Sequence, residues 1–185
     1  MRIEQIKKEY QIVVRWRAFP LHPDTPEDGL RIEDLFAGQP ADVDQMMRHL
    51  GQKAAELGLP FGDREKTYNS RLAQELGAWA ESKRQGHAFH MAAFKAYFVH
   101  GKNIAKIPVL LDLASAVGLS RDEAAFVLSD RTFKAAVDRD WLLSKGKGVT
   151  AVPTFVLNRD RLVGAQPYLG LEKMMIANGV EKRDK

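Results

Sequence analysis

The order of hydrophobic periodicities along the chain restricts the folds open to it more than any other feature. Residues 11–16, Gln-Ile-Val-Val-Arg-Trp, are β-branched and aromatic, which is typical of a β-strand. Helical spacing of apolar residues then continues for roughly a hundred residues before β-type composition returns at Thr154–Leu157. This order predicts that the two ends of the chain share a sheet and that the middle forms a helical subdomain.

The middle of the chain divides into amphipathic helices with recognisable ends. One is predicted from about residue 42 to Gly58, because its apolar residues recur at spacings of three and four. Ser120 and Glu123 have capping-box spacing at the start of another, since each side chain can satisfy a free amide of the first turn. Further helices are predicted around Ile6, Leu76, Phe94, Leu113, Val137 and Met174.

The second β-type region predicts a hairpin. Thr154–Leu157 and Arg161–Val163 flank the segment Asn158-Arg159-Asp160. Asn and Asp are frequent in tight turns because their side chains bond to the local main chain and tolerate left-handed conformations.

Composition excludes several classes of function. The chain has no cysteine, so it has no disulfide, thiolate metal site or thiol nucleophile. Its 28 basic and 24 acidic side chains give a formal charge of +4, dispersed along the sequence, which favours a solvated surface over nucleic-acid binding.

No apolar stretch reaches the roughly 18 residues of a membrane span. The charged N-terminus lacks the apolar segment of a secretory signal, so we expect a cytoplasmic protein.

The most specific motif is Gly148–Phe155, Gly-Val-Thr-Ala-Val-Pro-Thr-Phe. A proline cannot donate to a central ladder, so Pro153 belongs at the first residue of a strand. One interpretation is an ordinary trans proline at a strand entry. The other is a cis Val152–Pro153 bond, at a cost of about 0.5–1 kcal/mol, that exposes the Val152 main chain to a bound peptide or thiol.

Gly148–Phe155 resembles the cis-proline loop of thioredoxin-fold proteins, and the rest of the chain resembles the DsbA family, in particular FrnE-type oxidoreductases described as dithiol-disulfide isomerases. The matching stretches lie within residues 3–175 and are Val14–Pro23, Tyr68–Ala73, Phe94–Ile104 and Val163–Tyr168. The resemblance implies an α/β, DsbA-like thioredoxin fold. We expect a sheet subdomain of residues 1–37 and 148–185, and a helical insertion of residues 38–147.

The chain departs from this family at its beginning. Family members open with a β-strand that leads to a Cys-Pro-Trp-Cys-type motif, whereas this sequence begins inside the first helix, at Met1–Glu4. Disulfide exchange requires a thiolate. We therefore expect the chain to be redox-inactive as it stands, with no catalytic residue, no metal site and no cofactor.

The missing strand would lie between residues 11–16 and Thr154–Leu157, so its loss leaves two facing edges. Unpaired main-chain groups on these edges would cost of order 10 kcal/mol, at about 1–3 kcal/mol per buried group. We therefore expect the edges to be repaired. Either the two remaining strands pair directly, or a partner chain, such as a second copy in a homo-oligomer, supplies the pairing.

The resemblance implies that a substrate-binding groove survives at Val152, Pro153 and Thr154, with the Val152 main chain as the element that pairs with a peptide or thiol. Two other functions stay open. One is a glutathione-dependent enzyme, resembling 2-hydroxychromene-2-carboxylate isomerase and kappa-class transferases, which use a serine where the first cysteine would stand; that position is absent here too. The other is a catalytically empty module that binds peptides. We expect neither a nucleic-acid nor a membrane partner.

Overall fold

A computed structural model describes residues 2–37 and 42–184. These residues form two compact units, which we describe separately. Unit 1 contains residues 1–21 and 139–185, and unit 2 contains residues 22–138. Residue 38, where the helical insertion was predicted to begin, lies outside the described residues. Within the described ranges, no helix is both long enough and apolar enough to cross a membrane.

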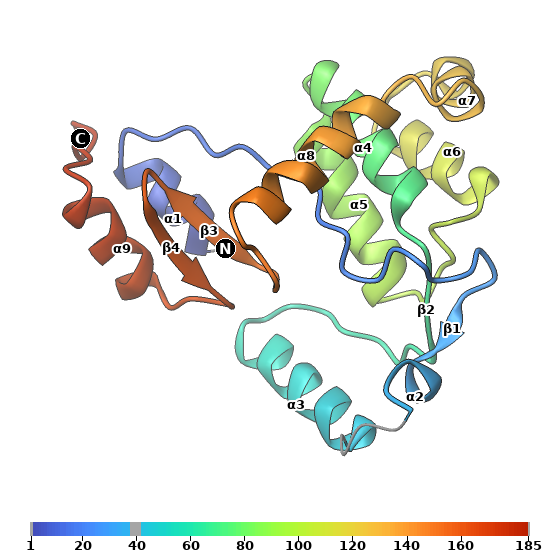
Figure 1. Ribbon diagram of the computed structural model, residues 1–185, viewed down its shortest axis with the longest axis horizontal. Helices are drawn as coiled ribbons and strands as arrows, with labels where there is room; N and C mark the ends of the chain where they lie inside the picture. Colours follow the sequence, from blue (N-terminus) through green and yellow to red (C-terminus); the bar gives the residue numbers. More distant parts are fainter. Residues whose placement is uncertain (1, 38–41, 185) are drawn as a thin grey trace. The chain divides into compact units, whose positions relative to one another are not determined.

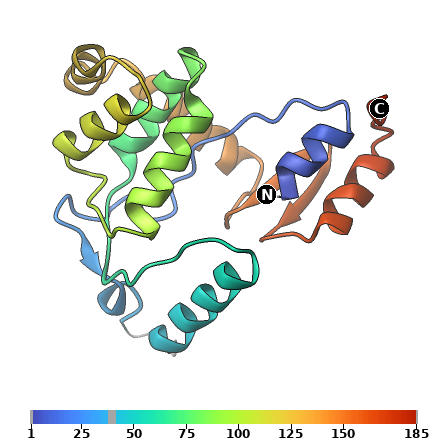
Figure 2. The same cartoon turned by 180° about the vertical axis from the view of Figure 1, so that it is seen from behind.

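Unit 1 is built on a β-hairpin and two helices (Figures 1 and 2). The hairpin consists of β3 (Thr154–Leu157) and β4 (Asp160–Val163). Helices α1 (Arg2–Glu9) and α9 (Tyr168–Ala177) pack against each other and against one face of the hairpin. The hairpin, α1 and α9 all match elements predicted from the sequence.

The hairpin register explains its turn. Leu157 lies opposite Asp160, so the connection has two residues, Asn158 and Arg159. Asn158 has a φ of 53°, in the left-handed region that Asn adopts more readily than other non-glycine residues. The turn is therefore one residue shorter than the three-residue segment expected from the sequence.

The core of unit 1 joins its two helices to the hairpin. Ile6 of α1 and Leu171 of α9 are fully or almost fully buried, and Phe155 and Leu157 of β3 pack against the same cluster. One face of β3 is thus held against the helices. Its other face carries Val156, which is 43% exposed.

Unit 2 is mainly helical. Its helices are α2 (Ile32–Leu35), α3 (Val43–Glu56), α4 (Arg71–Ser82), α5 (Gly86–Phe98), α6 (Ile107–Ala116), α7 (Arg121–Ser129) and the start of α8 (Lys134–Gly146). Two short strands, β1 (Leu30–Arg31) and β2 (Lys66–Thr67), pair antiparallel. The five long helices α3–α7 were predicted, and Ser120 caps α7 by accepting a hydrogen bond from the Glu123 amide at 3.3 Å.

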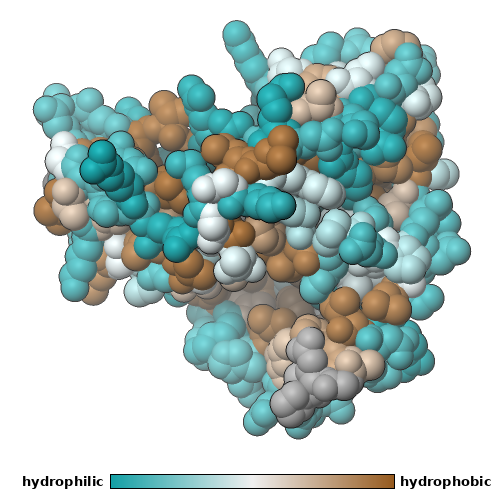
Figure 3. Space-filling view, viewed as in Figure 1, coloured by the Kyte–Doolittle hydropathy of each residue, from teal (hydrophilic) through white to brown (hydrophobic). Residues whose placement is uncertain are grey.

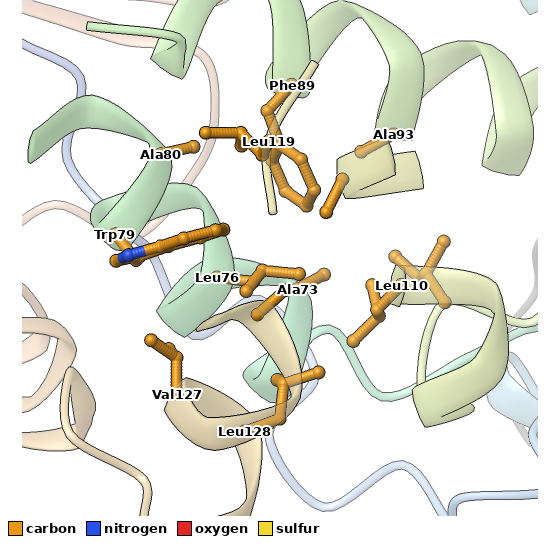
Figure 4. Close-up of a cluster of buried hydrophobic side chains, with 13 residues drawn as sticks. Ala73, Leu76, Trp79, Ala80, Phe89, Ala93, Leu110, Leu119, Val127 and Leu128 are labelled. Carbon is orange, nitrogen blue, oxygen red and sulfur yellow. The ribbon is translucent and has the colours of Figure 1, made fainter. Parts of the chain in front are cut away.

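The core of unit 2 lies among α4, α5, α6 and α7. Leu76 and Trp79 of α4 meet Phe89 of α5 and Leu110 of α6, and all four side chains point into a common interior (Figure 4). Burial of these large apolar groups is the main source of stability for a helical body of this kind.

The prediction of a strand over residues 11–16 is wrong. This segment belongs to no sheet, and in the described part of the chain β3 pairs with β4 alone, so the two expected strands do not pair directly. The segment is held instead near its ends. The Gln11 amide donates to the Glu181 carbonyl at 2.9 Å, and the Ala18 amide donates to the Asp140 carboxylate at 3.0 Å. β-branched residues favour a strand only where a neighbouring strand is available for pairing. Here the bonds to Glu181 and Asp140 hold the segment in a position where it pairs with no strand. Val13 is 84% exposed.

Candidate functional site

The loop that leads into β3 brings the three predicted site residues together at its end. Val152 and Pro153 are exposed, while Thr154 is half-buried as the first residue of the strand. The Val152–Pro153 peptide bond is cis. Because the three residues are consecutive, the structure keeps them adjacent, and the fold decides only which of their atoms are exposed.

Two hydrogen bonds fix the loop on either side of Val152. The Gly164 amide at the end of the hairpin donates to the Pro153 carbonyl at 2.7 Å. The Thr154 hydroxyl donates to the Ala151 carbonyl at 2.6 Å. Among the described residues, the Val152 main chain takes part in no hydrogen bond, and the residue is 45% exposed. Its main-chain N–H and C=O are therefore available on an anchored loop.

The end of α8 positions the loop from the other side. The Gly148 amide donates to the Lys145 carbonyl at 2.9 Å, and Gly148 has the positive φ (62°) that commonly ends a helix. The Arg161 guanidinium of β4 donates to the carbonyls of Lys147 and Gly148 at 3.0 and 2.8 Å. These bonds tie the helix end to the hairpin that carries the site.

Unit 1 has a concentration of positive charge that is not evident along the sequence. Its residues include 14 basic and 7 acidic side chains, a formal charge of +7, whereas unit 2 has 14 basic and 17 acidic side chains, a formal charge of −3. The fold gathers this charge by joining the two ends of the chain in one unit. Because the two ends were expected to share a sheet, counting their charged residues together could have predicted this excess of positive charge.

Most of the bases that the structure describes in unit 1 form no ion pair with a described acid. The ion pairs among its described residues use Lys7, Arg17 and Lys182. Lys145 and Lys147, just before the loop, form none in this part of the chain. The site therefore lies in a unit whose charge favours anionic ligands. The described residues contain no group of His, Cys, Asp and Glu side chains suited to a metal ion.

Comparison with known families and structures gives a consistent result. The profile of the DSBA-like thioredoxin domain matches residues 1–175. The structure of a probable DsbA oxidoreductase from Streptomyces coelicolor is 25% identical, with a TM-score of 0.87, over 100% of this chain and 85% of that chain. A search of curated proteins finds no match.

Two further solved structures are similar. The cytosolic disulfide reductase DsbM from Pseudomonas aeruginosa, solved with GSH, is 26% identical, with a TM-score of 0.54, over 74% of this chain and 78% of that chain. A 2-hydroxychromene-2-carboxylate isomerase is 20% identical, with a TM-score of 0.73, over 96% and 85% of the two chains, and is similar in fold.

Proposed function

Because the chain belongs to the DSBA-like thioredoxin-domain family, we propose that it is a cysteine-free docking module that binds the main chain of an extended peptide at Val152, Pro153 and Thr154. The chain has no thiolate with which to attack a disulfide. The observation that carries the proposal is the exposed Val152, whose main chain is unengaged among the described residues and lies beside the anchored Pro153.

An anchored main-chain donor and acceptor suit this role. A peptide in extended conformation presents N–H and C=O groups of its own, and their pairing with a protein main chain gives affinity without demanding a particular side chain. The bonds from Gly164 and Thr154 hold the loop before any ligand arrives. Less conformational entropy is then lost on binding than for a free loop.

A binding measurement tests the docking directly. The probe is an acetylated and amidated peptide of about seven residues in which Thr alternates with Val, long enough to form one strand. On titration into the ¹⁵N-labelled protein, we expect saturable changes in the amide resonances of Val152 and Thr154. The resonances of α6, in unit 2, serve as the internal control. Unchanged Val152 and Thr154 resonances at saturating peptide would contradict the proposal.

A redox assay tests the expectation that the protein has no disulfide-reducing activity. In the reduction of insulin by dithiothreitol, the protein should add nothing to the rate of the reductant alone, because it supplies no thiol. Any turnover that rises with protein concentration would show a redox activity that a cysteine-free chain should not have.

A second candidate function is the binding of glutathione, an anionic tripeptide. Two observations favour it: the similar DsbM structure was solved with GSH, and unit 1 carries a formal charge of +7. Calorimetric titration with glutathione distinguishes the candidates. Saturable heat favours the glutathione-dependent branch, and its absence leaves peptide docking. The similarity to a cytosolic reductase supports a cytoplasmic location for either activity.

A further inference from the structure

We infer that Arg161 is a positioning residue for peptide docking, because its side chain holds the loop before Val152 against the hairpin. The inference rests on the proposed docking at Val152 and adds the residue that prepares the loop for it. Arg161 acts through the main chain of the loop rather than by contact with the peptide.

The loop between α8 and β3 is held differently at its two ends (Figure 1). At the β3 end, the Gly164 amide donates to the Pro153 carbonyl, and at the α8 end, the Val149 amide donates to the Ser144 carbonyl at 2.9 Å. The first bond lies within the hairpin and its loop, and the second lies within the end of the helix. Neither bond sets the position of the helix end relative to the hairpin.

Arg161 connects these two ends. Its Nη1 donates to the carbonyls of Lys147 and Gly148 at 3.0 and 2.8 Å. Among the described residues, these are the only hydrogen bonds between residues 147–150 and the hairpin. The side chain thus limits where the helix end lies relative to β3, and with it the paths open to residues 149–152.

The hairpin register explains how Arg161 reaches the end of α8. In this register Phe155 lies opposite Leu162, and Val156 lies opposite Arg161. Phe155 and Leu162 pack against the core of unit 1. Because successive strand residues alternate between the two faces of a sheet, Arg161 projects from the face that points away from this core. A register shifted by one residue would turn the guanidinium toward the core instead.

The end of α8 also attracts the guanidinium electrostatically. The last carbonyls of a helix lack partners within the helix and carry partial negative charge, which a nearby cation stabilises. Among the described residues, no carboxylate lies within ion-pair distance of Arg161. Hydrogen bonds from a charged donor are also stronger than those between neutral groups. Arg161 is therefore suited to hold this helix end although it is exposed.

Order in the loop lowers the cost of docking. Pairing with a peptide requires one orientation of the Val152 main chain, and each residue that is fixed on binding loses conformational entropy. A loop that is already fixed loses less, so the peptide binds more tightly. The bond from Gly164 fixes the loop after Val152, and the bonds from Arg161 fix it before Val152.

Arg161→Gln tests whether these bonds order the loop. Gln is neutral, and its amide nitrogen takes the position of the Arg Nε, too far back to reach the carbonyls. Arg159→Gln is the matched control: it makes the same change of charge in the hairpin turn, where the exposed Arg159 side chain forms no hydrogen bond or ion pair with a described residue. In the unliganded protein, we expect ¹⁵N relaxation to show lower order parameters for the amides of residues 149–152 in Arg161→Gln alone.

Calorimetry with the neutral peptide of alternating Thr and Val then measures docking. We expect Arg161→Gln to bind about three- to tenfold more weakly than the wild type, because two hydrogen bonds no longer order the loop. Arg159→Gln should bind as the wild type does, since an uncharged peptide is little affected by the lost charge. Arg161→Lys keeps the charge and a donor closer to the carbonyls, so it should recover part of both the loop order and the affinity.

The variants should keep the fold of unit 1. Hydrophilic residues are spread over the visible face of this unit (Figure 3), and Gln adds no apolar group to its surface. Unchanged amide resonances of Ile6 and Leu171 would show that the core is intact. Where they change in Arg161→Gln, the same comparison is made between the wild type and Arg161→Lys.

The outcomes separate this inference from the docking on which it rests. Equal affinities of the wild type and Arg161→Gln, or an equal loss in Arg159→Gln, overturn the role of Arg161 and leave the docking at Val152 intact. Affinity that falls without loop order, or loop order that falls without affinity, also overturns it. Absence of binding by the wild type overturns the docking and the inference together.

Discussion

Both carboxylate oxygens of Glu75 accept hydrogen bonds from the guanidinium of Arg131. The Nε–Oε2 and Nη2–Oε1 distances are each 2.7 Å, and the Glu75 side chain is completely buried. Arg71, one turn before Glu75 on α4, donates to Oε1 at 2.6 Å. Arg131 lies just after α7 with a φ of 54°. The carboxylate therefore connects α4 to the segment between α7 and α8.

Glu75→Gln should strongly destabilise unit 2. The amide has the shape of the carboxylate but no charge, so Arg131 loses its charged partner and Arg71 keeps only its pair with Asp138. Breaking a buried pair in this way costs about 3–5 kcal/mol of unfolding free energy. Urea denaturation followed by Trp79 fluorescence measures the loss, with Trp16 and Trp141 replaced by Phe. Glu123→Gln is the control: its pair with Lys83 is exposed, and the expected change is below about 1 kcal/mol. Equal losses in the two variants would contradict the assignment.

The same carboxylate should make unit 2 sensitive to acid. Burial raises the pKa of Glu75, but hydrogen bonds from Arg131 and Arg71 outweigh it and hold the pKa below its ordinary value of 4.5. A pKa that is lower in the folded state gives stability that is complete above the unfolded pKa and is lost as the pH falls through the folded pKa. The unfolding free energy of the wild type should therefore fall more steeply below about pH 5 than that of Glu75→Gln. Parallel pH profiles would exclude this role.

Leu76→Ala tests the core of unit 2. The Leu76 side chain is fully buried against Trp79 and Phe89, so its removal should cost about 2–5 kcal/mol, depending on how far the cavity collapses. Phe126→Ala, on α7, is the control because Phe126 is 59% exposed and should cost less than about 1 kcal/mol. Urea denaturation of both variants supplies the comparison, and a reversed order would show that the core lies elsewhere.

Asn158→Val should weaken the hairpin that carries the candidate site. A β-branched residue in the left-handed conformation of Asn158 costs about 1–2 kcal/mol. Asn158→Gly suits the turn but loses the side-chain bond to Asn178, so it should be milder. Hydrogen exchange at the β3 and β4 amides should be fastest in Asn158→Val. Equal exchange in all three proteins would show that the turn does not limit hairpin stability.

The helices of unit 2 could be predicted because their signals are local. Apolar spacing, the Ser120 cap and the glycines that follow α3, α5 and α6 lie within one or two turns of the residues that they affect. The strand over residues 11–16 could not be judged in this way, because a strand depends on a neighbour distant in sequence. The bonds of Gln11 to Glu181 and of Ala18 to Asp140 join residues far apart along the chain, and no local sequence pattern predicts them.

The residues of the candidate site could be named from the sequence because their signal is also local. Val152, Pro153 and Thr154 are consecutive, and the hairpin beyond them has a clear turn signal. The bond from Gly164 to the Pro153 carbonyl, the Glu75–Arg131 pair and the charge of unit 1 each combine distant residues. They follow from the tertiary structure and carry no short sequence signature.

The unequal division of charge has a practical consequence for handling this protein. A cation-exchange resin should attract residues 1–21 and 139–185 and repel the remainder, although the molecule as a whole is only mildly basic. Adsorption would then hold the protein by the unit that carries Val152. An amine-reactive tag would not avoid this unit, because Lys145 and Lys147 lie just before the loop.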